Sequence, residues 1–157
     1  RFFDGIASLI GLAETVTYDG QAAMALEGIA EGKETAPFGL IRQNGVIVLD
    51  WRPSVRWLLE KRGRMSPGLI AGAVHNGLAE CVVQICRILR ESTGISEAAL
   101  SGGVWQNRRL TAFVSMMLKR EGFVPLLHRL LPPNDECVSV GQVAVGAALR
   151  KKEKRGE

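Results

Sequence analysis

Several kinds of residue are scarce in this 157-residue chain, and each scarcity excludes a class of protein. The 3 cysteines are an odd number without a C-x-x-C spacing, which excludes a disulfide framework and favours a reduced, cytoplasmic protein. The 2 histidines, His75 and His128, are too far apart in sequence to indicate a metal-binding pair. No apolar run approaches the roughly 18 residues of a membrane span, so we expect no transmembrane helix.

The chain also lacks an initiating Met and a signal-peptide pattern, because Arg1 leads directly into an amphipathic segment. We therefore expect a piece of a longer protein. The net charge is +4, and part of it falls in the Lys- and Arg-rich end of the chain. Such a run is typical of a solvated terminus, and we expect residues 151–157 to form a flexible basic tail. No basic patch interleaved with aromatic residues indicates nucleic-acid binding.

The remaining residues support a packed α/β lobe. Hydrophobic residues make up 46% of the chain, which is enough for the core of one domain or of half of a larger one. Asn44-Gly45 between two β-prone runs predicts a hairpin, and Ser66-Pro67 predicts the start of a long helix that ends at Gly94. Apolar spacing predicts helices over 2–10, 22–30, 54–62, 107–121 and 138–150, with later strands at 98–100 and 123–127. Because a helix separates the two later strands, we expect them to pair in parallel.

The segment Ser101–Asn107 follows the first of these parallel strands and is a candidate ligand site. Ligands in open α/β sheets bind beyond the carboxyl ends of the strands, where Gly102 and Gly103 would let a phosphate approach the backbone. Asn107 would then bond to a ribose or phosphate oxygen. The alternative is an ordinary tight turn, with Asn107 in the first turn of the next helix. The spacing alone does not separate these interpretations.

Carboxylates near other helix starts are also open to two interpretations. Asp135 either stabilises the N-terminus of the helix that follows or acts as a metal or nucleotide ligand. Asp4 is either a solvated first-turn residue or an acceptor for a ribose diol. Gly20 and Gln21, before the second helix, combine a flexible backbone with a polar side chain. We expect a structural, hydrogen-bonded role for His75.

These motifs in combination resemble a known family. Residues 1–12 (RFFDGIASLIGL), 18–24 (YDGQAAM), His75-Asn76, 101–107 (SGGVWQN) and 132–135 (PPND), followed by Ser139 and Gly141-Gln142, resemble the C-terminal part of the HypF carbamoyltransferases, which mature nickel–iron hydrogenases. The resemblance covers essentially the whole chain. It implies the second lobe of an actin-like ATPase (RNase H-like) fold, in which a nucleotide lies between two lobes.

The resemblance also implies a chemistry. HypF proteins use carbamoyl phosphate and ATP to form carbamoyl adenylate, and they pass the carbamoyl group to the C-terminal cysteine of the partner HypE. Asp4, Gly20 and Gln21 resemble nucleotide-contacting positions of the family. Gly102 and Gly103 resemble its phosphate-side turn, and Asn107 its adenylate-contacting amide. Asp135 resembles a carboxylate ligand of a bound iron or zinc. We therefore expect Asn107 and Asp135 to face one crevice.

The resemblance divides the chain and sets limits on it. Residues 1–150 would form the lobe, with a helical, nucleotide-contacting segment over 1–36 and an α/β part over 37–150. The histidine-rich metal motif and the preceding domains of HypF are not in this chain. Since transition metals need three or four ligands, we expect the isolated lobe to be inactive, to bind metal and ATP poorly, and to expose an apolar face that favours self-association. The alternatives are a lobe of a tRNA threonylcarbamoyladenosine-forming transferase, whose Pro-Gly-Gly loop is missing here, and a non-catalytic scaffold.

Overall fold

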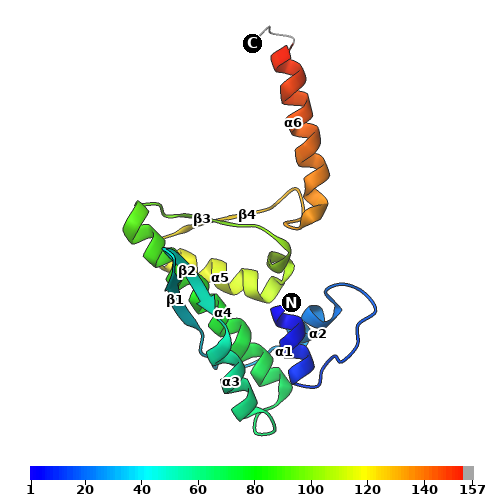
Figure 1. Ribbon diagram of the computed structural model, residues 1–157, viewed down its shortest axis with the longest axis vertical. Helices are drawn as coiled ribbons and strands as arrows, with labels where there is room; N and C mark the ends of the chain where they lie inside the picture. Colours follow the sequence, from blue (N-terminus) through cyan, green and yellow to red (C-terminus); the bar gives the residue numbers. More distant parts are fainter. Residues whose placement is uncertain (154–157) are drawn as a thin grey trace.

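The computed structural model describes residues 1–153, and the order of helices and strands that the sequence predicts is confirmed (Figure 1). Two short 3-10 helices, η1 and η2, are the additions to that order. The elements are α1 (Phe2–Leu9), α2 (Gln21–Ile29), β1 (Gly39–Gln43), β2 (Val46–Asp50), α3 (Arg52–Lys61), α4 (Pro67–Thr93), β3 (Glu97–Leu100), η1 (Gly103–Gln106), α5 (Arg108–Arg120), β4 (Val124–Leu127), η2 (Asp135–Cys137) and α6 (Val138–Glu153).

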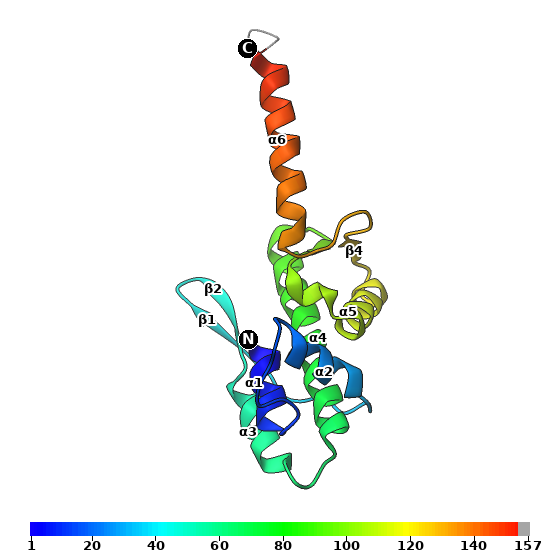
Figure 2. The same cartoon turned by 90° about the vertical axis from the view of Figure 1, so that its right-hand side faces the viewer.

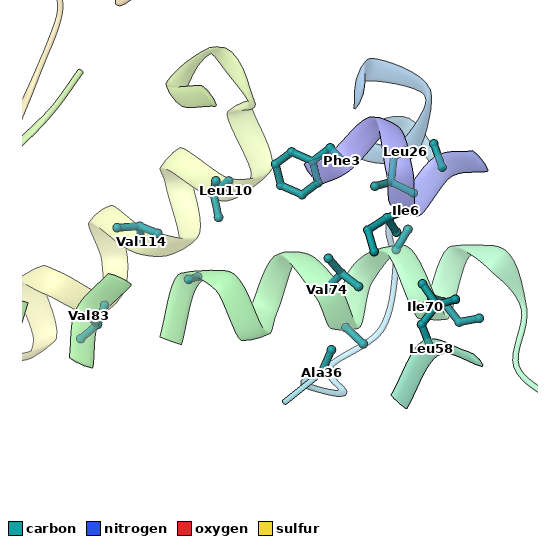
Figure 3. Close-up of a cluster of buried hydrophobic side chains, with 14 of the residues drawn as sticks. Phe3, Ile6, Leu26, Ala36, Leu58, Ile70, Val74, Val83, Leu110 and Val114 are labelled. Atoms are coloured by element: carbon teal, nitrogen blue, oxygen red, sulfur yellow. The ribbon is translucent and has the colours of Figure 1, made fainter. Parts of the chain in front are cut away.

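Helix α4 is the central element of the core. Its boundaries follow the sequence signals: the Ser66 Oγ accepts a hydrogen bond from the Leu69 N–H at 3.2 Å, and Gly94 ends the helix with a φ of 73°. Figure 3 shows side chains of α1, α2, α3 and α5 converging on it. Each large apolar side chain buried here contributes about 1.5–3 kcal/mol. The labelled members of this cluster are Phe3, Ile6, Leu26, Ala36, Leu58, Ile70, Val74, Val83, Leu110 and Val114.

The same helix is long and apolar enough to cross a membrane, and among residues 1–153 it is alone in this. The sequence prediction considered only uninterrupted apolar runs and did not single it out. Of its most apolar stretch, 61% is buried inside the fold. This burial is what the core helix of a globular lobe requires.

An extended segment after α2 lies directly along α4. The Glu31 N–H donates to the Gly68 carbonyl at 3.0 Å, and the Ala36 N–H donates to the Ala73 carbonyl at 2.9 Å. Glycines on α4 permit this approach, since a Cβ on Gly72 would lie 1.7 Å from the Glu31 carbonyl oxygen. The backbone of this segment therefore packs against the backbone of the helix, with no side chain between them.

The strands form two separate pairs. β1 and β2 are an antiparallel hairpin with positive φ at Asn44 (51°) and Gly45 (79°), which confirms the predicted turn. β3 and β4 pair in parallel across α5, as predicted. In the part of the chain that the structure describes, the two pairs do not join into one sheet. The expected open parallel sheet therefore consists only of β3 and β4. The crevice described below is lined mainly by α1, the start of α2 and η1, together with Leu49 of β2.

Helix α6 extends away from the rest of the lobe in both views (Figures 1 and 2). Its residues from Val138 to Leu149 are mostly apolar or glycine, and the large apolar side chains among them are exposed because nothing in the described structure covers them. The helix continues to Glu153, which is three residues into the predicted tail, and residues 154–157 lie outside the described part. Its exposed large apolar residues are Val138, Val140, Val143, Val145 and Leu149.

This surface predicts that the isolated chain self-associates through α6. Replacing Val143 and Leu149 by Lys should shift the chain toward monomer, because burying an ammonium group opposes association. Light scattering over a concentration series measures the effect. Gln142→Lys, on the same helix, adds charge without removing an apolar side chain and should have a smaller effect. A wild-type chain that stays strictly monomeric at high concentration contradicts the prediction.

Candidate functional site

Three segments that are distant in sequence meet around one crevice: the start of α1, the Asp19-Gly20 turn before α2, and η1. The crevice consists of two adjoining cavities of about 440 and 460 Å³, within the range of small-molecule sites. We call it the α1–α2–η1 crevice. Residues that line both cavities are Phe3, Asp19, Gly20, Ala23, Gly103, Val104 and Gln106.

The turn before α2 places Gly20 at the crevice and turns Gln21 away from it. Gly20 is the N-cap of α2 with a φ of 81°, and no side chain caps this helix end. The Gln21 Oε1 instead accepts hydrogen bonds from Thr17, at 2.7 Å from the backbone N–H and 3.2 Å from the hydroxyl. Asp19, not Gln21, is the polar side chain of this turn that lines the crevice.

Asp4 lies in the first turn of α1 and lines the larger cavity, of about 460 Å³. Its carboxylate is 4.0 Å from the Arg1 guanidinium in a largely exposed pair, which contributes little to stability. The carboxylate is therefore free to accept hydrogen bonds from a ligand. Both interpretations of Asp4, a first-turn acid and a ligand contact, are compatible with this position.

The double glycine joins the crevice to the segment that carries Asp135. Gly103 begins η1 and lines both cavities, whereas Gly102 lines neither. The Gly102 N–H donates to the Pro133 carbonyl at 2.7 Å, so Gly102 has a connecting role and its amide is occupied. Its φ of 104° explains why glycine is required there.

Asn107 has the capping role and also lines the crevice. Its Oδ1 accepts the Leu110 N–H at 2.8 Å, which caps α5, and its Nδ2 lies 2.8 Å from the His75 Nε2. The residue is 9% exposed and lines the smaller cavity. The two interpretations of Asn107 are therefore not exclusive.

His75 is buried beneath the crevice and has the hydrogen-bonded, structural environment expected of it. Its Nδ1 lies 2.7 Å from the Ala71 carbonyl, and its ring stacks on Phe3 with centroids 4.8 Å apart. Burial lowers the pKa of His75 below its usual 6.5, and the Arg109 charge lowers it further, whereas the Ala71 carbonyl and Glu27 oppose the shift. The ring is therefore held neutral.

The lowered pKa predicts a pH-dependent stability. Because the unfolded chain binds a proton at His75 more readily, stability from this group is complete above about pH 6.5 and is lost as pH falls toward the folded-state pKa, with a slope of at most about 1.4 kcal/mol per pH unit. Denaturant unfolding between about pH 7 and pH 5 measures the slope. His75→Phe, which removes the titrating group, should flatten it. An unchanged slope in His75→Phe assigns the dependence to other groups.

Asp135 lies on the segment that is hydrogen-bonded to Gly102, and it does not line the crevice. It is exposed in η2, whose N-cap is Asn134 without a side-chain hydrogen bond. Among residues 1–150 its carboxylate forms no hydrogen bond or ion pair, so no capping bond is formed, and its charge in the first turn of η2 is what remains to stabilise that helix end. The Gly102–Pro133 hydrogen bond brings the two predicted segments together, but Asp135 lines neither cavity. Convergence of Asn107 and Asp135 on one ligand stays a prediction.

The described residues alone do not fit an iron or zinc ion. No cluster of three or more His, Cys, Asp or Glu side chains with metal-binding geometry occurs within residues 1–153. A single exposed carboxylate cannot replace such a cluster, because these ions take three or four protein ligands. Any metal that Asp135 contacts would need its other ligands from outside this part of the chain.

The sequence did not single out several residues of the crevice. Phe3 belongs to the apolar spacing that predicts the first helix, and it also packs on His75 and lines both cavities. Val104 lies in the predicted motif and is 45% exposed, but nothing in the sequence separates it from the other residues of that motif. The pairing of His75 with Asn107 joins residues 32 positions apart and has no local signal.

Comparison with known proteins places this arrangement in a family. The family pattern described as "Carbamoyltransferase, Kae1-like Domain, second subdomain" matches residues 1–142. Carbamoyltransferase HypF of Synechocystis sp. is 40% identical over 96% of this chain, and that of Rhizobium leguminosarum bv. viciae is 32% identical over 92%. The chain spans 19% of the length of each of these two relatives.

Solved structures show the same fold. Full-length HypF in a phosphate- and nucleotide-bound form superposes with a TM-score of 0.88 at 30% identity, covering 95% of this chain and 20% of that one. T. kodakarensis HypF gives a TM-score of 0.76 at 28% identity, with 95% and 19% covered. The predicted α/β lobe is thereby confirmed. The chain belongs to the HypF carbamoyltransferase family, in which it corresponds to the second subdomain of the Kae1-like domain.

Proposed function

We propose that this chain is the nucleotide-contacting lobe of a carbamoyltransferase. In the complete protein, ATP and carbamoyl phosphate would give carbamoyl adenylate, and the carbamoyl group would pass to the C-terminal cysteine of a HypE-like acceptor protein. The single observation that carries the proposal is the α1–α2–η1 crevice, in a chain whose solved relative is described as phosphate- and nucleotide-bound. The three free cysteines agree with a reducing, cytoplasmic setting.

The polar groups of the crevice suit a nucleotide. The Asp4 and Asp19 carboxylates are acceptors for a ribose diol, and Asn107 offers an amide. The uncapped start of α2 at Gly20 presents backbone N–H groups of the kind that bind phosphate. Phe3, Val104 and Ala23 provide apolar surface for a base. These groups come from three segments, so the folded lobe is needed to assemble them.

The crevice is open, and this supports a site that is completed by other parts of the protein. Since the chain spans about a fifth of its relatives, the facing wall would come from the remaining domains. Binding to one wall leaves much of a ligand in water, so the isolated chain should bind ATP poorly. Micromolar ATP binding by the isolated chain, measured by calorimetry, contradicts this part of the proposal.

Gly103 offers the sharpest test, because a side chain there would enter the crevice without disturbing the fold. A Cβ on Gly103 meets no atom within 4 Å. In the full-length protein, Gly103→Ala and then Gly103→Val should weaken ATP binding in that order, with the valine raising Kd by at least about tenfold, equivalent to about 1.4 kcal/mol. Calorimetric ATP titration and the rate of carbamoyl transfer are the two measurements.

The matched control is Gly28→Ala. Gly28 lies in α2, lines neither cavity, and a Cβ there also meets nothing within 4 Å. This variant should leave ATP affinity unchanged. If both Gly103 variants bind ATP and transfer carbamoyl groups normally, the crevice is not the nucleotide site and the chain serves as a scaffold.

A further inference from the structure

We infer that His75 is a positioning residue for the nucleotide crevice: its neutral ring, protonated on Nδ1, fixes the orientation of the Asn107 amide. The inference rests on the proposed function, because Asn107 matters only if the crevice binds a nucleotide. His75 itself lines neither cavity and is 1% exposed. Any effect on a ligand must therefore pass through the groups that it holds.

The hydrogen bonds around His75 permit one assignment of donors and acceptors. The Leu110 N–H can only donate, so the Asn107 Oδ1 must be the atom that faces it at 2.8 Å. The Asn107 Nδ2 therefore faces His75 and donates to the Nε2 at 2.8 Å. With Nε2 accepting, the ring proton is on Nδ1, which donates to the Ala71 carbonyl at 2.7 Å.

The opposite assignment would break the network at two points. A proton on Nε2 would face the Asn107 amide N–H, and an unprotonated Nδ1 would face the Ala71 carbonyl oxygen. Turning the amide to present its oxygen would place the Nδ2 group against the Leu110 N–H and remove the cap of α5. The cap of α5 and the protonation state of His75 are therefore coupled through one side chain.

The ring also supports the opposite side of the crevice. Phe3, which lines both cavities from α1, stacks on His75 with an angle of 19° between the rings. Figure 3 shows Phe3 pointing from α1 toward α5, above α4. One buried ring on α4 thus contacts residues of two walls of the crevice.

The remaining hydrogen-bonding capacity of Asn107 is what a ligand would meet. Each Asn amide has two N–H donors and two acceptor lone pairs. His75 occupies one donor and the Leu110 N–H occupies one lone pair, which leaves one of each. A ligand that needs a donor at this position finds it only while the amide keeps its orientation.

The test uses two variants of His75 in the full-length protein. His75→Phe keeps a ring against Phe3 but has no acceptor, so the Asn107 N–H loses its partner. His75→Gln loses the ring but offers an acceptor oxygen at a similar reach. We expect His75→Phe to raise the KM and Kd for ATP by about tenfold with a smaller change in kcat, and His75→Gln to recover most of the affinity. Equal losses in the two variants, or none in His75→Phe, overturn the inference.

A double-mutant cycle with Asn107→Ala separates the inference from the proposed function. If His75 acts through Asn107, His75→Phe should weaken ATP binding little further in a protein that already carries Asn107→Ala. If Asn107→Ala binds ATP normally, the proposed contact and the inference are both wrong. If Asn107→Ala weakens binding and His75→Phe does not, the proposed function stands and the inference is wrong.

A spectroscopic measurement remains decisive if a variant does not fold. Selective ¹⁵N labelling of histidine in the wild-type full-length protein distinguishes a protonated from an unprotonated ring nitrogen by NMR. At neutral pH, His75 should show a protonated Nδ1 and an unprotonated Nε2. The reverse pattern, or a doubly protonated ring, overturns the inference.

Discussion

Gly72→Ala is expected to prevent stable folding of this chain. The added Cβ would lie 1.7 Å from the Glu31 carbonyl oxygen, which is far inside contact distance. The obstacle is backbone, so no side-chain rotation can relieve the overlap. The segment along α4 must move, and its Glu31–Gly68 and Ala36–Ala73 hydrogen bonds would be lost with it. We expect a loss of at least about 3 kcal/mol, the upper end of the usual cost of overpacking.

Denaturant unfolding monitored by circular dichroism measures this loss, and other glycines calibrate it. Gly77→Ala places a Cβ 2.1 Å from the Ala36 carbonyl oxygen and should be similarly damaging. Gly28→Ala has open space in a helix and should instead be neutral or stabilising by up to about 1 kcal/mol. If Gly72→Ala is as stable as the wild type, the packing of this segment on α4 is not as described.

Asp135→Ala should abolish carbamoyl transfer by the full-length protein with little change in stability. The carboxylate is exposed and unpaired within residues 1–153, so its removal disrupts no contact in the lobe. Its segment is joined to the glycine turn by the Gly102–Pro133 hydrogen bond, which places it near the proposed site. We expect a fall of at least about 10–100-fold, the size seen when a group that supports a metal site is removed, because the carboxylate would contact an ion whose other ligands come from the rest of the protein.

Glu136→Ala is the matched control, since this exposed carboxylate neighbours Asp135 in the same 3-10 turn. It should retain transfer activity. Steady-state transfer assays and thermal unfolding of both variants separate chemistry from folding. Normal transfer by Asp135→Ala removes this residue from the site. Asn107→Ala is a less selective test, because it removes the cap of α5 and a partner of His75 and should destabilise the lobe by about 1–3 kcal/mol.

The sequence predicted the local structure well because each element carries its own signals. Ser66-Pro67 and Gly94 bound the long helix, and Asn44-Gly45 makes the hairpin turn. These features depend on backbone conformations that a few residue types prefer. The parallel pairing of β3 and β4 followed from the helix between them.

The candidate site was predictable only in part, because its assembly depends on tertiary contacts. Gly103 and Asn107 were found from their motif, but the partner of Asn107 lies on another helix. Gln21 is next to a crevice residue and was grouped with it, yet its side chain bonds to Thr17. The close approach of the segment after α2 to Gly72 also has no local signature, since a helical glycine is equally compatible with open space.

Because α6 is exposed, we expect this helix to form stably only when another protein surface packs against it. A helix of 16 residues is marginal in water when nothing packs against it, and Gly141 and Gly146 weaken it further. The conformational entropy of ordering these residues must therefore be offset at the moment when another surface covers them. Whatever covers α6 would then act as a template for the helix, and its amide hydrogens would become protected from exchange only in the assembled state.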